Sequence, residues 1–290
     1  MLDIISVIVG GIIPGIILGG LYALMSCGLT LIWGTVGILN FAHGAFITFS
    51  GYMIWTFLNY LNINFAVAVC LAVALTFILG IIAELLIFRP LRGKVNAEMN
   101  SIYASLGMAM FLENMILLFF GPRRKAIPPV VVGNIAVGEV IITLHKLAII
   151  FIALSSLVAF SLFLKKTRYG MAMRAVAQNL LEAKVVGINI DRIYLLTIGL
   201  GSALAGIAGI FLGSLYYLWP TFGDIPLIKG FVIIVFGGLG NIRGTMYASF
   251  ILGIVESTVA LFMGSGWALP VMFMFMLFVL MFKPAGVFGG

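Results

Sequence analysis

The sequence contains very little charge. Asp, Glu, Lys and Arg together make up 9% of its 290 residues, whereas about a quarter of an ordinary soluble protein is charged. Three long runs, 4–83, 193–223 and 257–282, contain none of these four residue types. This scarcity excludes a soluble enzyme and a disordered chain, because both need a polar surface in contact with water.

Cysteine, histidine and catalytic motifs are also scarce. The chain has two cysteines and two histidines, too few cysteines for a secreted disulfide scaffold. Cys27 and Cys70 lie in apolar runs, where small buried hydrophobic side chains are expected. No GxxxxGK(S/T) phosphate loop, HExxH zinc motif or GxSxG nucleophile motif occurs. We therefore expect no catalytic residue, metal site or cofactor on this chain, so a gradient or another subunit must supply any energy.

Apolar residues make up 63% of the chain. A bilayer span needs about 20 apolar residues per helix, and a helix satisfies its backbone groups without help from water. Barrel strands would alternate in polarity, which these runs do not do. The sequence therefore predicts an all-α, polytopic membrane bundle of about eight to nine spans, with broken or re-entrant helices. The candidate spans are 4–32, 41–60, 66–88, 97–120, 147–164, 193–217, 226–240, 244–262 and 268–282, of which 226–240 is short for a full crossing.

The net charge of +7 indicates membrane topology rather than nucleic acid binding, because basic residues remain on the cytoplasmic side. Two basic clusters, 89–94 and 165–192, are separated by an even number of predicted spans, so both are expected in the cytoplasm. The N-terminus is then outside and the C-terminus inside. The cluster 123–125 falls outside and does not fit this rule. We expect one transmembrane domain over 1–290, with 121–146 as an external loop.

Two features of this bundle have local sequence signals. The external loop is expected to form a short hairpin between Val130–Val132 and Val140–Ile142. Small residues also recur at intervals of four, which lets helix backbones approach closely within one subunit or between subunits. These small residues are Gly11, Gly15, Gly19 and Ala23 in one span, and Gly201, Ala205, Gly209 and Gly213 in another.

Two Gly-rich segments, 34–44 and 237–244, interrupt the helical pattern. Non-helical backbone at membrane depth is tolerated only where protein or water covers it, and paired interruptions in two halves of a chain indicate a transport pathway. The alternative is that both segments are cytoplasmic turns with capping Asn residues. The sequence leaves the two interpretations open.

A few polar groups lie within the apolar spans, where ionisable side chains are costly and face the bundle interior. Glu113 and Asn114 lie within 97–120, and Glu256 lies within 244–262. Asn40 and His43 lie in the first Gly-rich segment. We predict a substrate path lined by Asn40, His43, Glu113 and Asn114, against the alternative of hydrogen bonds and packing between helices.

The segment 165–192 is the longest polar stretch on the predicted cytoplasmic side. It has helical composition from Met171 to Val186, and Gly187 is a plausible C-cap. Asn189 or Asp191 could cap the next span. A short helix on this face suits docking onto a partner, and the alternative is an amphipathic helix resting on lipid headgroups.

Several motifs together resemble the branched-chain amino-acid ABC transporter permeases. The motifs are spread over most of the chain. One position departs from the family pattern, because the family has Gln more often than Glu at the position of Glu113. The motifs are GLTLIWG at 28–34 with LNFAHG at 39–44, FRPLRG at 88–93, LEN at 112–114 followed by FGP at 120–122, and FGGLGNIRG at 236–244.

This resemblance implies one of two homologous permease subunits in the plasma membrane of a bacterium or archaeon, the inner membrane if Gram-negative. The expected partners are a second permease, two cytoplasmic ATPases that hold ATP and Mg, and a periplasmic or lipid-anchored substrate-binding protein. The resemblance also implies that Glu182, Ala183 and Gly187 belong to the loop that docks on the ATPase. Arg174 lies on the same polar helix and is expected to take part in coupling.

The resulting hypothesis is an ATP-driven importer of branched-chain or other hydrophobic amino acids, of which this chain forms half the path. Within the same class, the substrate could be urea, a short amide or another neutral amino acid. A proton-coupled secondary transporter using Glu113, Glu256 or His43 is the alternative class. A passive channel is a third possibility, and neither of these two mechanisms needs the segment 165–192.

Overall fold

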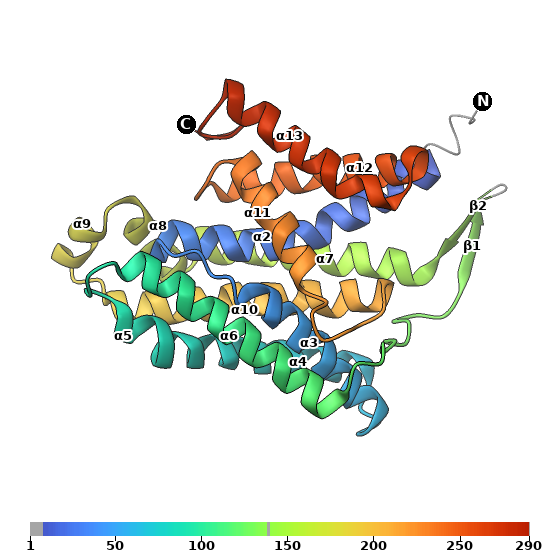
Figure 1. The fold of residues 1–290 in the computed structure, drawn as a ribbon, viewed down its shortest axis with the longest axis horizontal. Helices are drawn as coiled ribbons and strands as arrows, with labels where there is room; N and C mark the ends of the chain where they lie inside the picture. Colours follow the sequence, from blue (N-terminus) through green and yellow to red (C-terminus); the bar gives the residue numbers. More distant parts are fainter. Residues whose placement is uncertain (1–7, 138–139, 290) are drawn as a thin grey trace.

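The computed structural model describes residues 8–137 and 140–289 (Figure 1). The elements are, in chain order, η1 (Ile8–Ile12), α2 (Ile13–Val36), α3 (His43–Asn59), α4 (Phe65–Ala83), η2 (Glu84–Phe88), α5 (Arg89–Leu91), α6 (Ala97–Phe120), β1 (Asn134–Val137), β2 (Val140–Thr143), α7 (Leu144–Lys166), α8 (Arg168–Gln178), α9 (Leu180–Val185), α10 (Ile190–Leu215), α11 (Asp224–Gly237), α12 (Ile242–Met263), η3 (Ser265–Trp267) and α13 (Ala268–Phe282).

The predicted polytopic helical bundle is confirmed. Among the described residues, seven helical segments are long and apolar enough to cross a bilayer. The helices α3 and α11 are apolar but have only 17 and 14 residues, about 26 and 21 Å at 1.5 Å per residue, short of a bilayer core of about 30 Å. The predicted number of eight to nine spans is therefore approximate, because two of the expected spans are partial helices.

The helix α2 lies at the centre of the bundle and is buried along almost its whole length. Its small residues allow this burial, because a Cβ atom on Gly15 would lie 2.6 Å from the Cα of Ile254 on α12. A Cβ atom on Gly201 of α10 would lie 2.7 Å from Cδ1 of Ile32 on α2. Both stripes of small residues thus serve packing within this chain, as one of the two interpretations expected.

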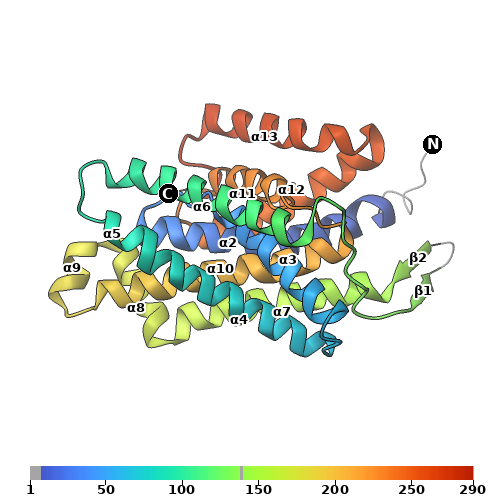
Figure 2. The same ribbon diagram turned by 60° about the horizontal axis from the view of Figure 1, so that its bottom comes forward.

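The bundle has two chemically different ends (Figures 1 and 2). One end, here called the basic end, carries α5, α8 and α9 and with them the basic clusters 89–94 and 165–192. The opposite end, the hairpin end, carries β1 and β2. Arg89 and Arg92 both bind Asp191, so the expectation that the two clusters share one side is confirmed.

The hairpin forms, but with a different first strand than expected. Residues Asn134–Val137 pair with Val140–Thr143 in an antiparallel register that places Ile135 opposite Ile142. The expected strand Val130–Val132 is wrong, because Val130 is held through its backbone instead: its N–H donates to Nδ1 of His145 at 3.0 Å. The residues 123–125 lie near this end, where Lys125 pairs with Leu218 through two backbone hydrogen bonds.

The polar segment forms two helices rather than the single helix expected from 171 to 186. The helix α8 ends at Gln178, and Asn179 begins α9. The Oδ1 atom of Asn179 accepts hydrogen bonds from the N–H groups of Leu181 at 3.0 Å and Glu182 at 3.3 Å. An Asn side chain that caps a new helix in this way competes with continuation of the preceding helix.

Candidate functional site

The first Gly-rich interruption re-enters the bundle. The helix α2 stops at Gly37, whose positive φ of 76° turns the chain back, and Asn40 is then 1% exposed. The Oδ1 atom of Asn40 accepts a hydrogen bond from the N–H of Ala42 at 3.0 Å. The Nε2 atom of His43 lies 3.0 Å from the carbonyl oxygen of Met25, near the middle of α2. The interruption is therefore exposed at Gly37, and its non-helical backbone reaches the interior at Asn40 and Ala42.

The second Gly-rich interruption is an Asn-capped turn at the basic end, as the alternative interpretation expected. The Oδ1 atom of Asn241 accepts a hydrogen bond from the N–H of Gly244 at 3.0 Å. Its Nδ2 atom donates to the carbonyl oxygen of Phe288 at 2.7 Å. Gly240 lines a small cavity together with Met173 of α8, which fixes the turn at this end.

The interruption that matches the first one lies instead at 216–223. The chain leaves α10 at the hairpin end and returns to the interior, where the N–H of Gly223 donates to Oγ1 of Thr48 at 2.8 Å. A Cβ atom on Gly44 would lie 2.8 Å from the carbonyl oxygen of Gly223. The N-termini of α3 and α11 thus meet inside the bundle and run to opposite ends. Such half-helix N-termini present free N–H groups and the positive ends of helix dipoles.

The remaining predicted path residues lie on α6. Glu113 is half-buried, and its carboxyl group is close enough to Asp224 at the start of α11 to interact with it. Asn114 is exposed, and its Nδ2 atom donates to the carbonyl oxygen of Met110 at 2.7 Å within the same helix. Among the described residues, no hydrogen bond joins this pair to the first interruption. The substrate path through these four residues remains a prediction.

A buried ionic cluster on α2, α11 and α12 includes a residue that the sequence analysis missed. The Nζ atom of Lys229 lies 2.6 Å from Oε1 of Glu256 and 2.9 Å from the hydroxyl oxygen of Tyr22. The hydroxyl of Tyr22 donates to Oε2 of Glu256 at 2.8 Å. The signal available in the sequence was one basic and one acidic residue in neighbouring apolar spans, 226–240 and 244–262.

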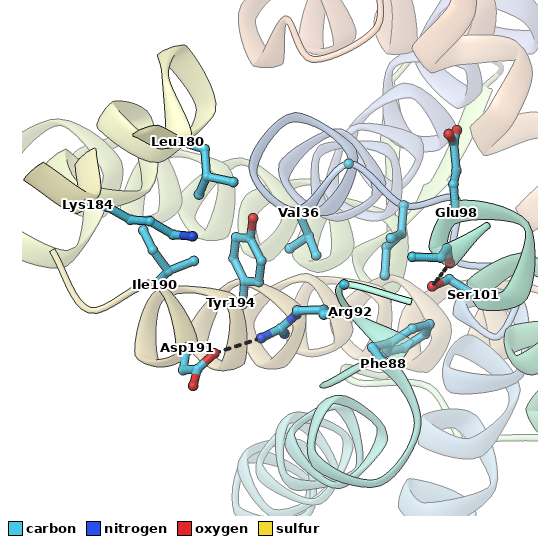
Figure 3. A pocket seen from close by; sticks show the side chains of 14 residues that line it. Val36, Phe88, Arg92, Glu98, Ser101, Leu180, Lys184, Ile190, Asp191 and Tyr194 are labelled. Carbon is cyan, nitrogen blue, oxygen red and sulfur yellow. Dashed lines mark hydrogen bonds and ion pairs between the residues drawn. The ribbon is translucent and has the colours of Figure 1, made fainter. Parts of the chain in front are cut away.

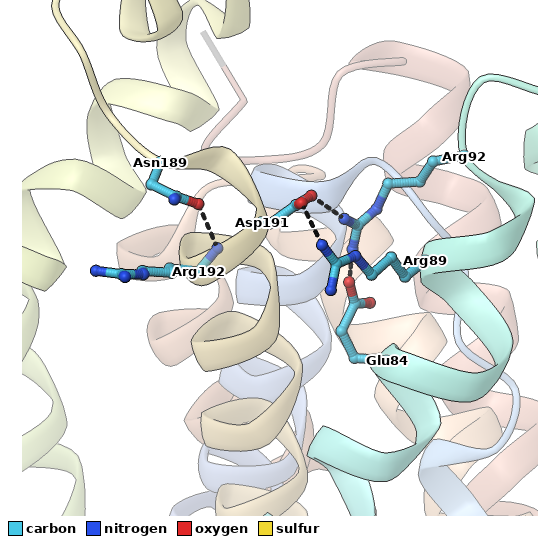
Figure 4. A network of polar contacts seen from close by, with 6 residues as sticks. All are labelled: Glu84, Arg89, Arg92, Asn189, Asp191 and Arg192. Carbon is cyan, nitrogen blue, oxygen red and sulfur yellow. Dashed lines mark hydrogen bonds and ion pairs between the residues drawn. The ribbon is translucent and has the colours of Figure 1, made fainter.

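A second ionic network lies at the basic end and connects α10 to the segment after α4 (Figure 4). Glu84 is 1% exposed and forms an ion pair with Arg92, whereas its nearest basic neighbour in the chain is Arg89. Asp191 binds Arg89 at 2.7 Å and Arg92 at 3.0 Å. Burial lowers the pKa of the Arg92 guanidinium, while Asp191 and Tyr194 raise it. The network ties the turn after α4 to the start of α10.

A cavity of about 410 Å³ lies beside this network (Figure 3). Leu180 and Lys184 of α9 line one side, and Val36 and Gly37 at the end of α2 line another. Arg92 contributes to a third side, with its guanidinium 4.3 Å from the centre of the Tyr194 ring. The polar segment therefore meets the point where the chain turns back into the bundle.

The predicted coupling residues lie together on α8 and α9. Arg174 and Glu182 are exposed, and Nδ2 of Asn179 donates to Oε1 of Glu182 at 2.7 Å. Ala183 is 2% exposed, and its carbonyl oxygen accepts a hydrogen bond from the N–H of Ile188 at 3.0 Å. Gly187 has a φ of +83°, which confirms the predicted C-cap. Their role in coupling remains a prediction.

The helix α9 also presents apolar side chains at the basic end. Leu181, Val185 and Val186 are 72%, 86% and 73% exposed. An exposed apolar cluster of this kind among basic residues is typical of a surface that binds a partner or a membrane.

Asn189, not Asp191, caps the following helix α10, since its Oδ1 atom accepts a hydrogen bond from the N–H of Arg192 at 3.0 Å.

Comparisons with known proteins agree with these features. A family model described as branched-chain amino acid transport system / permease component matches residues 11–282. The chain is 32% identical to the high-affinity branched-chain amino acid transport system permease protein BraD of Pseudomonas aeruginosa, over 96% of this chain and 94% of that protein. It is 31% identical to the LivH permease protein of Escherichia coli (strain K12), over 95% and 93% respectively. The probable LivH permease of Methanocaldococcus jannaschii is 28% identical over 87% of this chain and 81% of its own length. Since these matches cover nearly the whole bundle, the chain belongs to the family of branched-chain amino acid transport system permease components.

Proposed function

We propose that this chain is the transmembrane permease subunit of an ATP-driven importer of branched-chain or other hydrophobic amino acids. It resides in the plasma membrane, with a second homologous permease completing the path. Two cytoplasmic ATPases hold ATP and Mg and hydrolyse the nucleotide, and a substrate-binding protein delivers the amino acid from outside. Family membership supports the transport role, and the exposed segment at the basic end supports the ATPase partner.

The observation that best supports docking of an ATPase is the exposed apolar surface of α9. Leu181, Val185 and Val186 extend into the space beyond the bundle, and a Schellman-type turn at Gly187 fixes the end of the helix. A short, rigidly capped helix with an apolar face suits insertion into a groove on another protein. A channel or a proton-driven carrier has no need of such a surface.

The position of α8 offers a route from this surface to the interior. Met173 and Arg174 of α8 line a cavity with Thr30 and Gly34 of α2. The last turn of α2 leads directly into the re-entrant interruption that ends at His43. Displacement of α8 and α9 by closing ATPases would therefore move the end of α2 and the start of α3. A ligand-driven shift of this kind requires different ATPase affinities for the two states.

Reconstitution of the complete complex in liposomes tests the proposal. In liposomes whose ATPases face the lumen, we expect leucine to accumulate inside only when the lumen contains ATP. This accumulation should not follow an imposed pH gradient. Uptake driven by the pH gradient without ATP would contradict the proposal and favour the proton-coupled mechanism. Equilibration without either energy source would indicate a channel, and ATP-driven uptake of urea in place of leucine would correct the substrate.

Charge reversal on the coupling segment tests how the energy reaches the bundle. The variants Arg174→Glu and Glu182→Lys are expected to lower leucine uptake per ATP hydrolysed by about tenfold or more, the effect of losing one charge-assisted contact of about 1.4 kcal/mol. Lys94→Glu is the matched control, because Lys94 is exposed at the same end outside this segment. Normal coupling in both variants, with intact assembly, would show that another surface transmits the force.

A further inference from the structure

A third cavity lies in the half of the bundle nearer the hairpin end. Its volume is about 330 Å³, at the lower end of the range for small-molecule sites. It lies between α2, α10, α11, α12 and the start of α13, and exposed Ser265 lies on its wall at the turn between α12 and α13. Most of the wall is aromatic or aliphatic: Leu212, Tyr216, Trp219, Phe222, Pro226 and Leu269.

The ionic cluster of Tyr22, Lys229 and Glu256 forms the polar part of the same wall. The side chains of Lys229 and Glu256 are 13% and 9% exposed, so both charges have left bulk water. Within a membrane bundle such charges are costly and are retained at substrate or ion pathways. Packing alone does not explain them, because a buried ion pair is often no more stable than apolar residues of equal volume.

The arrangement of charges selects one class of ligand. One cation and one anion stand side by side on an otherwise apolar wall, which is complementary to an ammonium and a carboxylate separated by one carbon atom. The ammonium group of Lys229 has three N–H donors and uses two of them, on Glu256 and Tyr22. Glu256 accepts one hydrogen bond at each of its oxygens and has further lone pairs for a second donor.

We propose that this cavity binds an apolar amino acid, with Lys229 holding its α-carboxylate and Glu256 holding its α-ammonium group. The side chain of the amino acid then packs against Trp219 and Phe222. Binding adds two ion pairs beside the existing one and does not change the net charge of the site. Urea and simple amides gain no such pairs, so the site favours zwitterions among the neutral solutes.

The location of the cavity agrees with a path through the bundle. Phe222 and Pro226 of its wall flank Gly223 and Asp224, where α11 begins beside α3. An amino acid released from the cavity would meet the junction of the two half-helices next. The choice of an amino acid as substrate rests on the proposed function. The structure itself supplies the paired charges and the apolar wall.

Protection of a thiol at the cavity tests the site directly in the full-length chain in membrane vesicles. The variant Ser265→Cys is made in a Cys70→Ser background, and labelling by a methanethiosulfonate reagent is timed with and without leucine. We expect saturating leucine to slow labelling by at least about fivefold. Neither 3-methylbutylamine, which lacks the carboxylate, nor 4-methylpentanoate, which lacks the ammonium, should protect to this extent.

Two controls separate binding from structural effects. Tyr60→Cys places an exposed thiol on the same side of the bundle outside the cavity, and leucine should leave its labelling unchanged. The double variant Lys229→Gln/Glu256→Gln, added to Ser265→Cys, removes both charges together and leaves neither unpaired. We expect it to keep the melting temperature of the parent and to lose protection by leucine.

The outcomes distinguish this site from the proposed function. Three results would overturn the proposed site. They are no protection by leucine, protection by leucine that is no better than that by its two one-charge analogues, and protection by leucine that survives in the double Gln variant. If those results accompany ATP-driven leucine uptake by the complete complex, the importer stands and the site fails. If the protection pattern appears as expected while uptake ignores ATP, the site stands and the energy source fails.

Discussion

At the scale of single residues, two ion pairs hold charges that lie inside the bundle or at its edge. Glu84 is paired with Arg92, which also reaches Asp191 from α10. Lys229 is paired with Glu256. Glu256 was predicted within an apolar span, whereas Lys229 was not predicted as a site residue, because its pairing depends on the packing of α11 against α12.

Removal of one member of the Glu84–Arg92 pair is expected to destabilise the fold. The variant Arg92→Met leaves the carboxylate of Glu84 buried without its cation, which costs about 3 kcal/mol. Arg89→Met is the matched control, because its pair with Asp191 is about half exposed on both sides and contributes at most about 1 kcal/mol. Thermal unfolding in detergent should separate the two variants, and equal melting temperatures would contradict a structural role for the buried pair.

At the scale of elements, the interruptions decide how the bundle is built. The Gly-rich segment 34–44 was identified from its sequence, and its final part enters the interior as non-helical backbone. The segment 237–244 is also Gly-rich but forms a capped turn. The matching interruption at 216–223 contains Pro220 and Gly223 and lies between two apolar runs, which was the available signal.

Substitution of Gly223 tests whether the two half-helices must touch. A Cβ atom on Gly223 would overlap the carbonyl oxygen of Gly44, so Gly223→Ala is expected to cost about 1–3 kcal/mol by overpacking and to reduce uptake. Gly107→Ala in α6 is the control, because nothing lies within 4 Å of its added Cβ atom and Ala favours the helix. Unchanged melting and uptake in Gly223→Ala would show that the junction tolerates separation.

At the scale of the whole molecule, the ends differ in charge and in exposed surface. The clusters at 89–94 and 165–192 share the basic end, while the cluster at 123–125 lies near the hairpin end. From the positive-inside rule we expect the basic end, with α8 and α9, to lie in the cytoplasm. The cavity proposed to bind an amino acid lies nearer the opposite end, which would then face outside.

Thiol accessibility in intact cells and inverted vesicles tests this orientation. In a Cys70→Ser background, Val185→Cys at the basic end should react with an impermeant maleimide only in inverted vesicles. Val132→Cys, which is 87% exposed before the hairpin, should react only in intact cells. The reverse pattern would invert the topology and remove the basis for ATPase docking at α9. The parent with Cys27 alone should remain unlabelled, because that thiol is buried.

The amino-acid sequence alone was enough to predict the class of molecule. Long apolar runs require a helical bundle, because a helix satisfies its own backbone groups in lipid. The small residues predicted close helix packing, and Gly187 predicted the end of the polar helix. Only the three-dimensional packing settled which interruption enters the core and which charges form pairs. Those outcomes depend on contacts between residues far apart in the chain, such as Gly44 with Gly223 and Lys229 with Glu256, and local composition carries no record of such contacts.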